Sequence, residues 1–429
     1  MAVTSITLER QMRATIHIGT TKTGTTSIQH FLHANHGLLL EQGCLYPQCL
    51  LHPVLAKARS LYHHNLLAMQ LVRDAPDRYL APLRSELAAA SDCRQLLISA
   101  ENFSAYMQHG EQLGRLQAFL RQLGCSEVRI VVWLRESGAW FVSMCSESLR
   151  AGEHAGHHLQ PPRDNAQYRF WLDYRALLQR WSAAFGREAL SVRLFERNCF
   201  VQGDLLHDAV EAFALSWDKR FTLPPRVNES LNLLEMELLR VLNNLLPGAT
   251  YNAQGSPKAR LYEVLHRHLG ALNAPALSFV PPQAVVQAWR EWAAEGNEWV
   301  RRNFFPGRTA LFAPAPEQPE NYELTRMTPG CWEALGRALA DLSSENFRLH
   351  RQLQLARHDL QELRGGGADA AADGTRTRPG AQAAGGSAPS PAAAGQNRRT
   401  RRQSSSRRRG RGGGTGGGTG PAPGGAAAG

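Results

Sequence analysis

The region that most constrains the fold of this chain is a strand, a glycine loop and a helix predicted within residues 14–32. Residues 14–18 form an apolar, β-prone run, and residues 19–24, G-T-T-K-T-G, follow it as a loop. A helix-like segment covers 25–32. Glycines let backbone N–H groups turn inward, and a helix N-terminus carries partial positive charge. The region therefore predicts an anion-binding cradle at the end of a strand.

The chemistry of the loop favours a phosphate or sulfate ester as ligand. Lys22 supplies a full positive charge, and the neighbouring threonines supply hydroxyl donors. In a standard nucleotide triphosphate loop, the lysine directly follows the second glycine. Here Lys22 stands two residues before Gly24, and a threonine takes the lysine's usual place. The loop is P-loop-like but departs from the standard pattern; a short glycine-rich loop that arose by chance is the alternative.

The segment K-T-G-T-T at residues 22–26 resembles the 5′-phosphosulfate loop of sulfotransferases that use 3′-phosphoadenosine 5′-phosphosulfate (PAPS). This resemblance implies that Lys22 is catalytic and holds the bridging oxygen of the phosphosulfate. It also implies that loop amides and threonine hydroxyls hold the 5′-phosphate. The cofactor-binding residues predicted in this loop are Thr21, Lys22, Thr23, Gly24, Thr25 and Thr26.

A second motif supports the first. The apolar run 128–134 predicts a strand covered on both faces, as in a parallel sheet. In the sulfotransferase family, the 3′-phosphate site is an arginine at the end of such a strand and a serine eight residues later in the next helix. Arg135 and Ser143 match this spacing, and a guanidinium suits phosphate because it forms paired hydrogen bonds. A surface arginine and a helix serine are the alternative.

Glu101 is the first candidate for the catalytic base. It follows the apolar run 96–98, which predicts another central strand. Ligands of open α/β sheets lie at the carboxyl ends of strands, where Lys22 and Arg135 are also predicted. Glycan-modifying sulfotransferases carry a glutamate base in a similar place, so the resemblance implies that Glu101 takes the acceptor proton. A glutamate that stabilises a helix N-terminus is the alternative.

Histidines compete for the same role. His63 and His64 lie in a predicted helix between the first and second strands. Other members of the fold use a histidine base, and an unperturbed imidazole titrates near neutrality. An acceptor-orienting role and a plain surface position are alternatives. A separate cluster, His154, His157 and His158, lies in a glycine- and proline-containing loop without a cysteine at ligand spacing. We interpret this segment as an exposed loop near the acceptor and not as a zinc site.

The resemblance covers residues 12–312 and implies a three-layer α/β fold, with a central, mostly parallel sheet and helices on both faces. An aromatic stripe over 168–185 predicts a core helix, and 189–195 predicts a further strand. Arg226, Asn228 and Ser230 open a predicted helix, where they either reach the nucleotide or cap the helix. Two more helices are predicted over 261–272 and 284–300.

The implied reaction is transfer of the sulfuryl group of PAPS to a hydroxyl or amine of a glycan or small-molecule acceptor. In-line displacement depends mainly on positioning and on stabilising the spreading charge. Lys22 neutralises the leaving phosphate oxygen, and no metal is expected. A P-loop-type phosphotransferase is the rival, but it requires a lysine beside the second glycine.

Composition favours a cytoplasmic enzyme. The chain has 429 residues, 43% of them hydrophobic, which is enough for one sizeable α/β core. Seven scattered cysteines without metal-ligand spacing suit free thiols in a reducing compartment. No apolar run approaches the ~18 residues of a membrane span, and the N-terminus lacks the apolar core of a signal peptide.

The C-terminal part differs in character. Over 331–364, apolar residues (seven leucines and Ala356) recur at alternating spacings of four and three, with Asn346 at the one remaining core position. This heptad pattern predicts a long helix and a possible parallel coiled coil that forms a homodimer through 335–363. A single amphipathic helix packed on the domain is the alternative.

Residues 365–429 consist mainly of glycine, alanine, proline, serine, threonine and arginine, which predicts a disordered tail. Ten arginines against two aspartates give this tail +8 of the chain's formal charge of +11. Such a tail suits electrostatic contact with polyanions, and a nucleic-acid-binding protein acting through it is the second rival function. A solvated extension without a partner is the alternative.

Overall fold

The structure is a computed structural model of the chain. It describes residues 12–51, 63–73, 76–153, 159–224, 230–246, 257–272, 274–314 and 318–372. The chain divides into two compact units, Met1–Arg357 and His358–Gly429. Within the described residues, the helices include none that is both long and apolar enough to cross a membrane. The predicted loop histidines 154, 157 and 158, together with Arg226, Asn228 and most of the C-terminal tail, lie outside the described residues.

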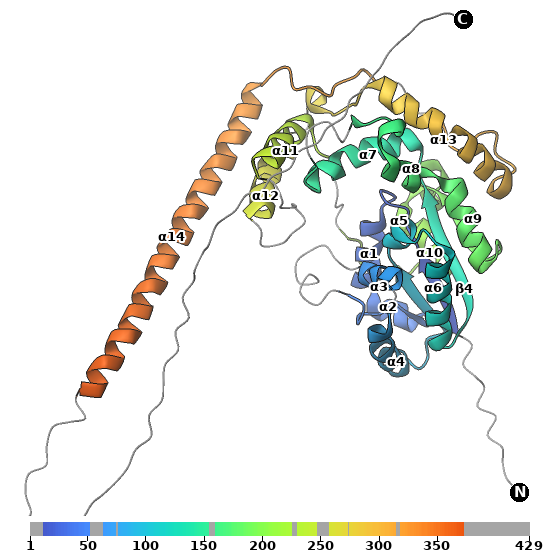
Figure 1. Cartoon of the computed structure of the whole chain (residues 1–429), viewed down its shortest axis with the longest axis horizontal. Coiled ribbons are helices and arrows are strands. Elements are labelled where there is room, and N and C mark those ends of the chain that lie inside the picture. The colour runs from blue at the N-terminus through green and yellow to red at the C-terminus, as the bar shows by residue number, and fades with distance from the viewer. Residues whose placement is uncertain are drawn as a thin grey trace, which may run out of the picture. The chain divides into compact units, whose positions relative to one another are not determined.

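A sheet of five parallel strands forms the centre of the described part of the first unit (Figure 1). The strands are β1 Met12–His17, β2 Cys44–Leu45, β3 Gln95–Ser99, β4 Cys125–Leu134 and β5 Leu190–Leu194. Their order is β2-β3-β1-β4-β5, so β1 lies between β3 and β4. Ile16 pairs with Ile98 on one side and Ile130 on the other. The predicted α/β fold with a parallel sheet is confirmed.

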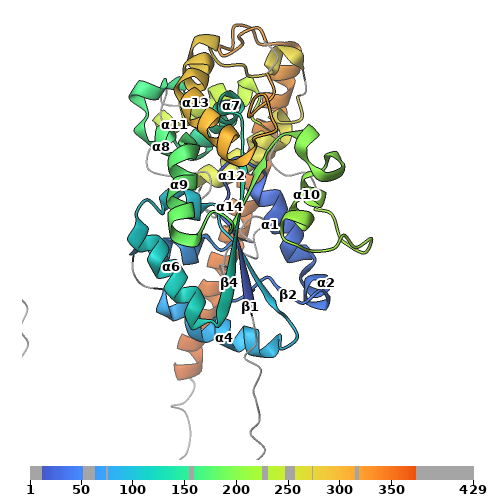
Figure 2. The same ribbon diagram turned by 90° about the vertical axis from the view of Figure 1, so that its right-hand side faces the viewer.

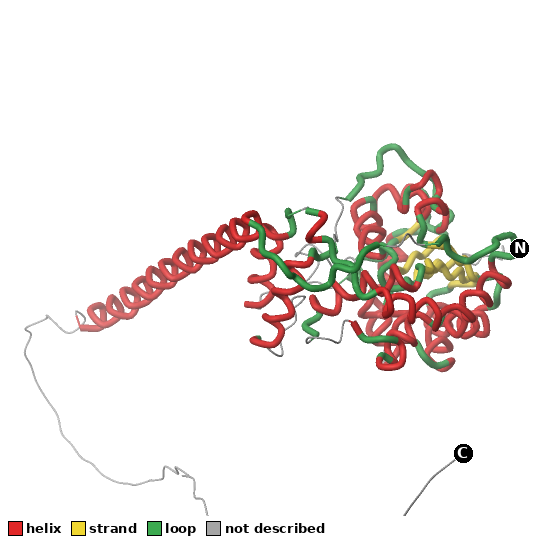
Figure 3. The backbone as a smooth tube through the Cα atoms, turned by 90° about the horizontal axis from the view of Figure 1, so that it is seen from above, coloured by secondary structure: helices red, strands yellow, loops and turns green. Residues whose placement is uncertain are grey.

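Helices cover both faces of the sheet. The α-helices of the described residues, which include helices away from the sheet, are α1 Thr25–Ala34, α2 His36–Glu41, α3 Asn65–Arg73, α4 Leu80–Ala89, α5 Asn102–Tyr106, α6 Gly110–Gln122, α7 Ser137–Arg150, α8 Ala166–Leu172, α9 Tyr174–Phe185, α10 Leu205–Ala212, α11 Leu233–Leu245, α12 Pro257–Leu269, α13 Gln283–Phe304 and α14 Pro329–Ala372. Seen along the sheet, α1, α2 and α10 lie on one side and α6 and α9 on the other (Figure 2). Figure 3 shows the strands of the sheet in yellow, grouped together with helices around them.

Alternation along the strands explains why the apolar runs are continuous. Ile130 and Val132 point into the larger core, whereas Val131 and Trp133 point into a second core with α1 and α10. Both faces are therefore buried, and neither can carry the polar residues of a solvated sheet face. The three-layer arrangement predicted from the resemblance follows from these two cores.

One predicted helix is in fact two. The sequence predicts a single helix over 168–185, but the chain breaks at Asp173 into α8 and α9. The Asp173 carboxylate accepts a hydrogen bond from the backbone N–H of Ala176 at 2.9 Å, which caps α9 at its N-terminus. The predicted end at Gly186 is confirmed, since this residue has a φ of 86°.

Two other helix starts differ from the prediction. His64 precedes α3, which begins at Asn65, so it does not lie within a helix. The helix expected to open near Arg226 begins at Leu233. There Asn232 and Glu235 form a capping box, in which each side chain accepts a hydrogen bond from the other's backbone N–H.

The long C-terminal helix α14 spans the predicted 331–364 segment and continues to Ala372. Its first turns belong to the first unit, because Cys331, Ala334 and Ala338 are buried in an apolar cluster with residues of α11 and α12. The alternative of a helix packed on the domain therefore describes this part of α14. Beyond it, Leu349 and Leu353 are 53% and 48% exposed.

Candidate functional site

The backbone and the packing of the glycine loop between β1 and α1 favour glycine at the loop's second glycine position. Gly24 has a φ of 73° and stands directly before the first residue of α1. A Cβ at this position would overlap the Leu205 side chain and lie 3.2 Å from the Phe195 ring. The left-handed backbone and the close packing together favour glycine at this position.

Internal hydrogen bonds hold the loop in shape. The Thr20 hydroxyl donates to the Trp133 carbonyl at 3.0 Å, and the Thr23 hydroxyl donates to the Thr20 carbonyl at 2.6 Å. Both threonines are buried. The Thr23 hydroxyl is therefore already used as a donor within the loop.

Lys22 and Arg135 meet at the ends of adjacent strands. Lys22 has a φ of 63°, and its carbonyl accepts a hydrogen bond from Arg135 Nη1 at 2.7 Å. The Lys22 ammonium forms an ion pair with Glu147, with 3.3 Å between Nζ and Oε2. The two predicted donor-binding residues thus lie in direct contact, although they are far apart in sequence.

Arg135 is held from several directions. The Tyr174 hydroxyl donates to the Arg135 carbonyl at 2.8 Å, and the guanidinium lies 5.3 Å from the centre of the Phe195 ring. Burial lowers the pKa of Arg135 from its usual value, because the charged form is poorly solvated there. A bound anion would compensate this buried positive charge.

Helix α7 presents one face to the loop. Trp140 Nε1 donates to the Thr21 carbonyl at 3.0 Å, and Glu147 reaches Lys22. Ser143 lies between these two contacts at spacings of three and four residues, so it belongs to the same helix face. The sequence interpretation assigned no role to Trp140 or Glu147, although their helical spacing with Ser143 was readable.

Glu101 approaches the loop from β3. It precedes the first residue of α5, and its Oε2 accepts a hydrogen bond from the Thr25 hydroxyl at 2.5 Å. A Cβ on Gly19 would lie 3.4 Å from the Glu101 Cα, so backbone and loop are close there. Glu101 is therefore tied to the first turn of α1, on the side of the loop formed by β3.

His64 occupies a different environment. Its ring is fully buried, Nδ1 accepts a hydrogen bond from the Ser99 backbone N–H at 3.2 Å, and Nε2 lies 3.0 Å from the Pro47 carbonyl. These partners assign a neutral ring that donates through Nε2. Burial lowers the pKa of His64 to about 3. Both ring nitrogens are thus engaged in holding β3 to the segment that contains Pro47.

A second buried histidine lies on β1. His17 Nδ1 is 2.8 Å from the Ser99 hydroxyl, which also accepts a hydrogen bond from Gln29 at 3.2 Å. Burial lowers the pKa of His17 to about 3. This network links β1, β3 and α1 beneath the loop, and no periodic pattern of the sequence marks it.

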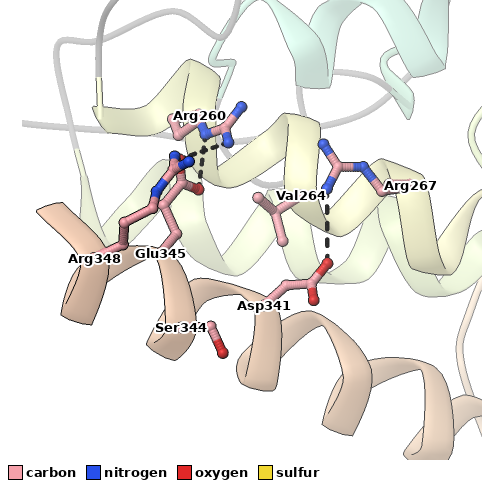
Figure 4. Close-up of a pocket in the computed structure, with 7 residues that line it drawn as sticks. All are labelled: Arg260, Val264, Arg267, Asp341, Ser344, Glu345 and Arg348. Carbon is pink, nitrogen blue, oxygen red and sulfur yellow. Dashed lines mark hydrogen bonds and ion pairs between the residues drawn. The ribbon is translucent and has the colours of Figure 1, made fainter.

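Metal ligands do not gather in the described part of the chain: no group of three or more histidine, cysteine, aspartate or glutamate side chains is placed to hold an ion. A surface groove of about 290 Å³ lies between α12 and α14 (Figure 4). Arg260 pairs with Glu345 there, and Arg267 with Asp341. None of the predicted site residues lines this groove.

Comparisons with known proteins give distant similarities. No protein-family model matches the chain. An uncharacterized protein of Archaeoglobus fulgidus is 22% identical over 233 residues, which are 53% of this chain and 59% of that protein's length.

Two solved structures are also similar. A sulfotransferase from Alicyclobacillus acidocaldarius is 14% identical with a TM-score of 0.33, over 53% of this chain and 91% of that one. A sulfotransferase domain from the curacin biosynthetic pathway is 10% identical with a TM-score of 0.28, over 51% and 80%. At these scores neither similarity assigns an activity to this chain.

Proposed function

We propose that this chain is a sulfotransferase that moves the sulfuryl group of PAPS to a hydroxyl or amine of a small-molecule or glycan acceptor. The observation that carries the proposal is the contact between Arg135 and the Lys22 carbonyl. It brings together the two motifs that resemble the family, one for the 5′-phosphosulfate and one for the 3′-phosphate. A single ligand with phosphates at both positions would bind to both.

Different residues bind different groups of the donor. The loop amides and the N-terminus of α1 hold the 5′-phosphate, since both direct N–H groups and positive charge to the same point. Arg135 and Ser143 hold the 3′-phosphate. Lys22 neutralises the bridging oxygen as the bond between sulfur and that oxygen breaks. The products are the sulfated acceptor and 3′-phosphoadenosine 5′-phosphate (PAP).

We assign the acceptor proton to Glu101. As the acceptor oxygen or nitrogen bonds to sulfur, its proton moves to the carboxylate. Glu101 lies beside the loop through its hydrogen bond with Thr25, whereas both nitrogens of His64 already have partners. The geometry favours Glu101 as the base and a structural role for His64.

The described chain also favours a partner and a location. We propose a homodimer through the exposed part of α14, where Asn346, Leu349 and Leu353 continue the heptad pattern. We propose a cytoplasmic location because all seven cysteines are free thiols.

The proposal is tested by calorimetric titration of the full chain with PAP and with ATP, followed by an assay with sulfur-labelled PAPS and a panel of hydroxyl and amine acceptors. PAP should bind at least about tenfold more tightly than ATP, because only PAP carries a 3′-phosphate for Arg135. A chain that binds ATP as tightly as PAP, or that transfers phosphate, would contradict the proposal.

A further inference from the structure

The ammonium of Lys22 already has an anionic partner in the protein. Glu147 Oε2 lies 3.3 Å from Lys22 Nζ, and the two side chains are 35% and 19% exposed. Glu147 lies one helical turn after Ser143, on the face of α7 that contacts the loop. A carboxylate of the chain therefore stands where the proposed donor would bring its own negative charge.

A second cation holds Glu147 in place. Arg150 Nη1 lies 3.8 Å from Glu147 Oε2 on the same helix. Arg150 in turn donates through Nε to the Tyr262 hydroxyl of α12 at 3.0 Å. Glu147 thus lies between a cation of the loop and a cation that is anchored to a neighbouring helix.

These contacts set up a competition for one ammonium. If the phosphosulfate approaches Lys22, the ammonium must leave Glu147, at least in part, to reach the bridging oxygen. Arg150 stays paired with the carboxylate, because its anchor on α12 does not depend on the loop. The ion pair at Lys22 can therefore open without leaving Glu147 unpaired.

We propose that Glu147 is the resting counter-ion of Lys22 and that the donor anion displaces it, so that this carboxylate lowers donor affinity. The inference rests on the proposed function and adds a positioning residue to it. Glu147 keeps the ammonium beside the α7 face that carries Ser143 when the site is empty. It touches neither the donor nor the reacting atoms.

The test compares PAP binding by the wild-type full chain with that of Glu147→Gln, Glu147→Asp and Glu153→Gln. Glu147→Gln should bind PAP about two- to fivefold more tightly, the range expected when a partly exposed ion pair no longer competes. Glu147→Asp keeps a carboxylate near Lys22 and should stay close to wild type. Glu153→Gln removes the charge of a carboxylate that follows α7 and does not pair with Lys22, and it should leave PAP affinity unchanged.

A second readout is independent of PAP. The chain has only four lysines, so amine labelling of Lys22 is resolved by mass spectrometry, with Lys219 as internal reference. An ammonium tied to a carboxylate reacts more slowly than a free one. Relative labelling of Lys22 should therefore rise in Glu147→Gln and remain unchanged in Glu153→Gln.

The outcomes separate this inference from the proposed function. Unchanged or slower labelling of Lys22 in Glu147→Gln overturns the inference, whether or not the PAP affinity of that variant changes. Unchanged or weaker PAP binding in that variant, with its thermal unfolding as in wild type, also overturns it. A wild-type chain that does not bind PAP contradicts the proposed function. The labelling of Lys22 still decides, independently of PAP, whether Glu147 restrains its ammonium.

Discussion

Lys22 is the residue on which the proposed chemistry depends. Its backbone carbonyl and its side-chain ammonium have different partners. The backbone of Lys22 is left-handed, and its carbonyl accepts a hydrogen bond from Arg135. Its ammonium pairs with Glu147. The backbone contact survives if the side chain moves. The loop can therefore keep its shape while the ammonium exchanges one anion for another.

Replacing Lys22 with methionine should remove most of the turnover and spare the fold. The variant keeps the length of the side chain but cannot neutralise the leaving oxygen, a loss worth about 10²- to 10³-fold in rate. Turnover of labelled PAPS and circular dichroism measure the two effects. Lys219→Met, at an exposed lysine outside the site, is the matched control. A Lys22→Met rate within threefold of wild type would contradict the mechanism.

The buried histidines predict a loss of stability at acidic pH. In the folded chain the pKa values of His17 and His64 are lowered to about 3 from 6.5, so the unfolded chain binds more protons between these values. Stability is therefore fully present above about pH 6.5 and falls below it by about 1.4 kcal/mol per pH unit for each histidine.

Urea unfolding at pH 7.5, 6.0 and 5.0 measures this dependence. The variant His64→Gln should show a shallower decline than wild type, because one titrating group is gone. A free energy of unfolding that stays constant between pH 7.5 and 5.0 would show that these rings are not buried as neutral groups.

Among the elements, α7 and α9 both help to place the candidate site. Glu136 caps α7 by accepting hydrogen bonds from the N–H groups of Gly138 and Ala139, at 2.9 and 2.7 Å. The helix then presents Trp140 to the loop one turn later. From α9, the Tyr174 hydroxyl donates a hydrogen bond to the backbone carbonyl of Arg135.

The cap of α9 can be tested alone. Asp173→Ala removes the side chain that starts α9, and should lower the free energy of unfolding by about 1 kcal/mol. Chemical denaturation provides the measurement. Asp164→Ala is the control, because that aspartate pairs with its exposed neighbour Arg163 and caps no helix of the described residues. Equal destabilisation by both variants would argue against the cap.

At the scale of the whole molecule, α14 begins within the first unit and continues into the segment for which we propose self-association. Its first turns pack against α11 and α12, so a coiled coil through all of 335–363 would displace an existing apolar cluster. The free part of the seam is the part that begins at Asn346. A polar residue at such a core position favours a defined register between two helices.

We expect a mass of two chains in solution at micromolar concentration, measured by light scattering. Leu349→Glu and Leu353→Glu should each yield monomers, because they place charges in the seam. Leu355→Glu is the matched control, since Leu355 is 58% exposed but lies outside the heptad positions. A wild-type chain that is monomeric would exclude the dimer.

Much of the fold and part of the candidate site were predictable from local patterns. The strand, the glycine loop and the helix after it follow from residue type and spacing alone, as does the position of Arg135 at the end of β4. Such features depend on neighbours along the chain. The sequence also marked Ser143 by its spacing, and the helix α14 by its heptads.

The pairings between distant segments were decided by the tertiary structure. Lys22 and Glu147 are 125 residues apart, and nothing local to either one marks the other as its partner. His64 looked like a base in the sequence, yet the pairing of its segment with β3 buries both ring nitrogens. By itself the sequence determined the strand, the glycine loop and the helix that follows it. The order of the strands in the sheet decided which side chains reach this loop, because that order sets which loops and helices meet at the carboxyl edge of the sheet.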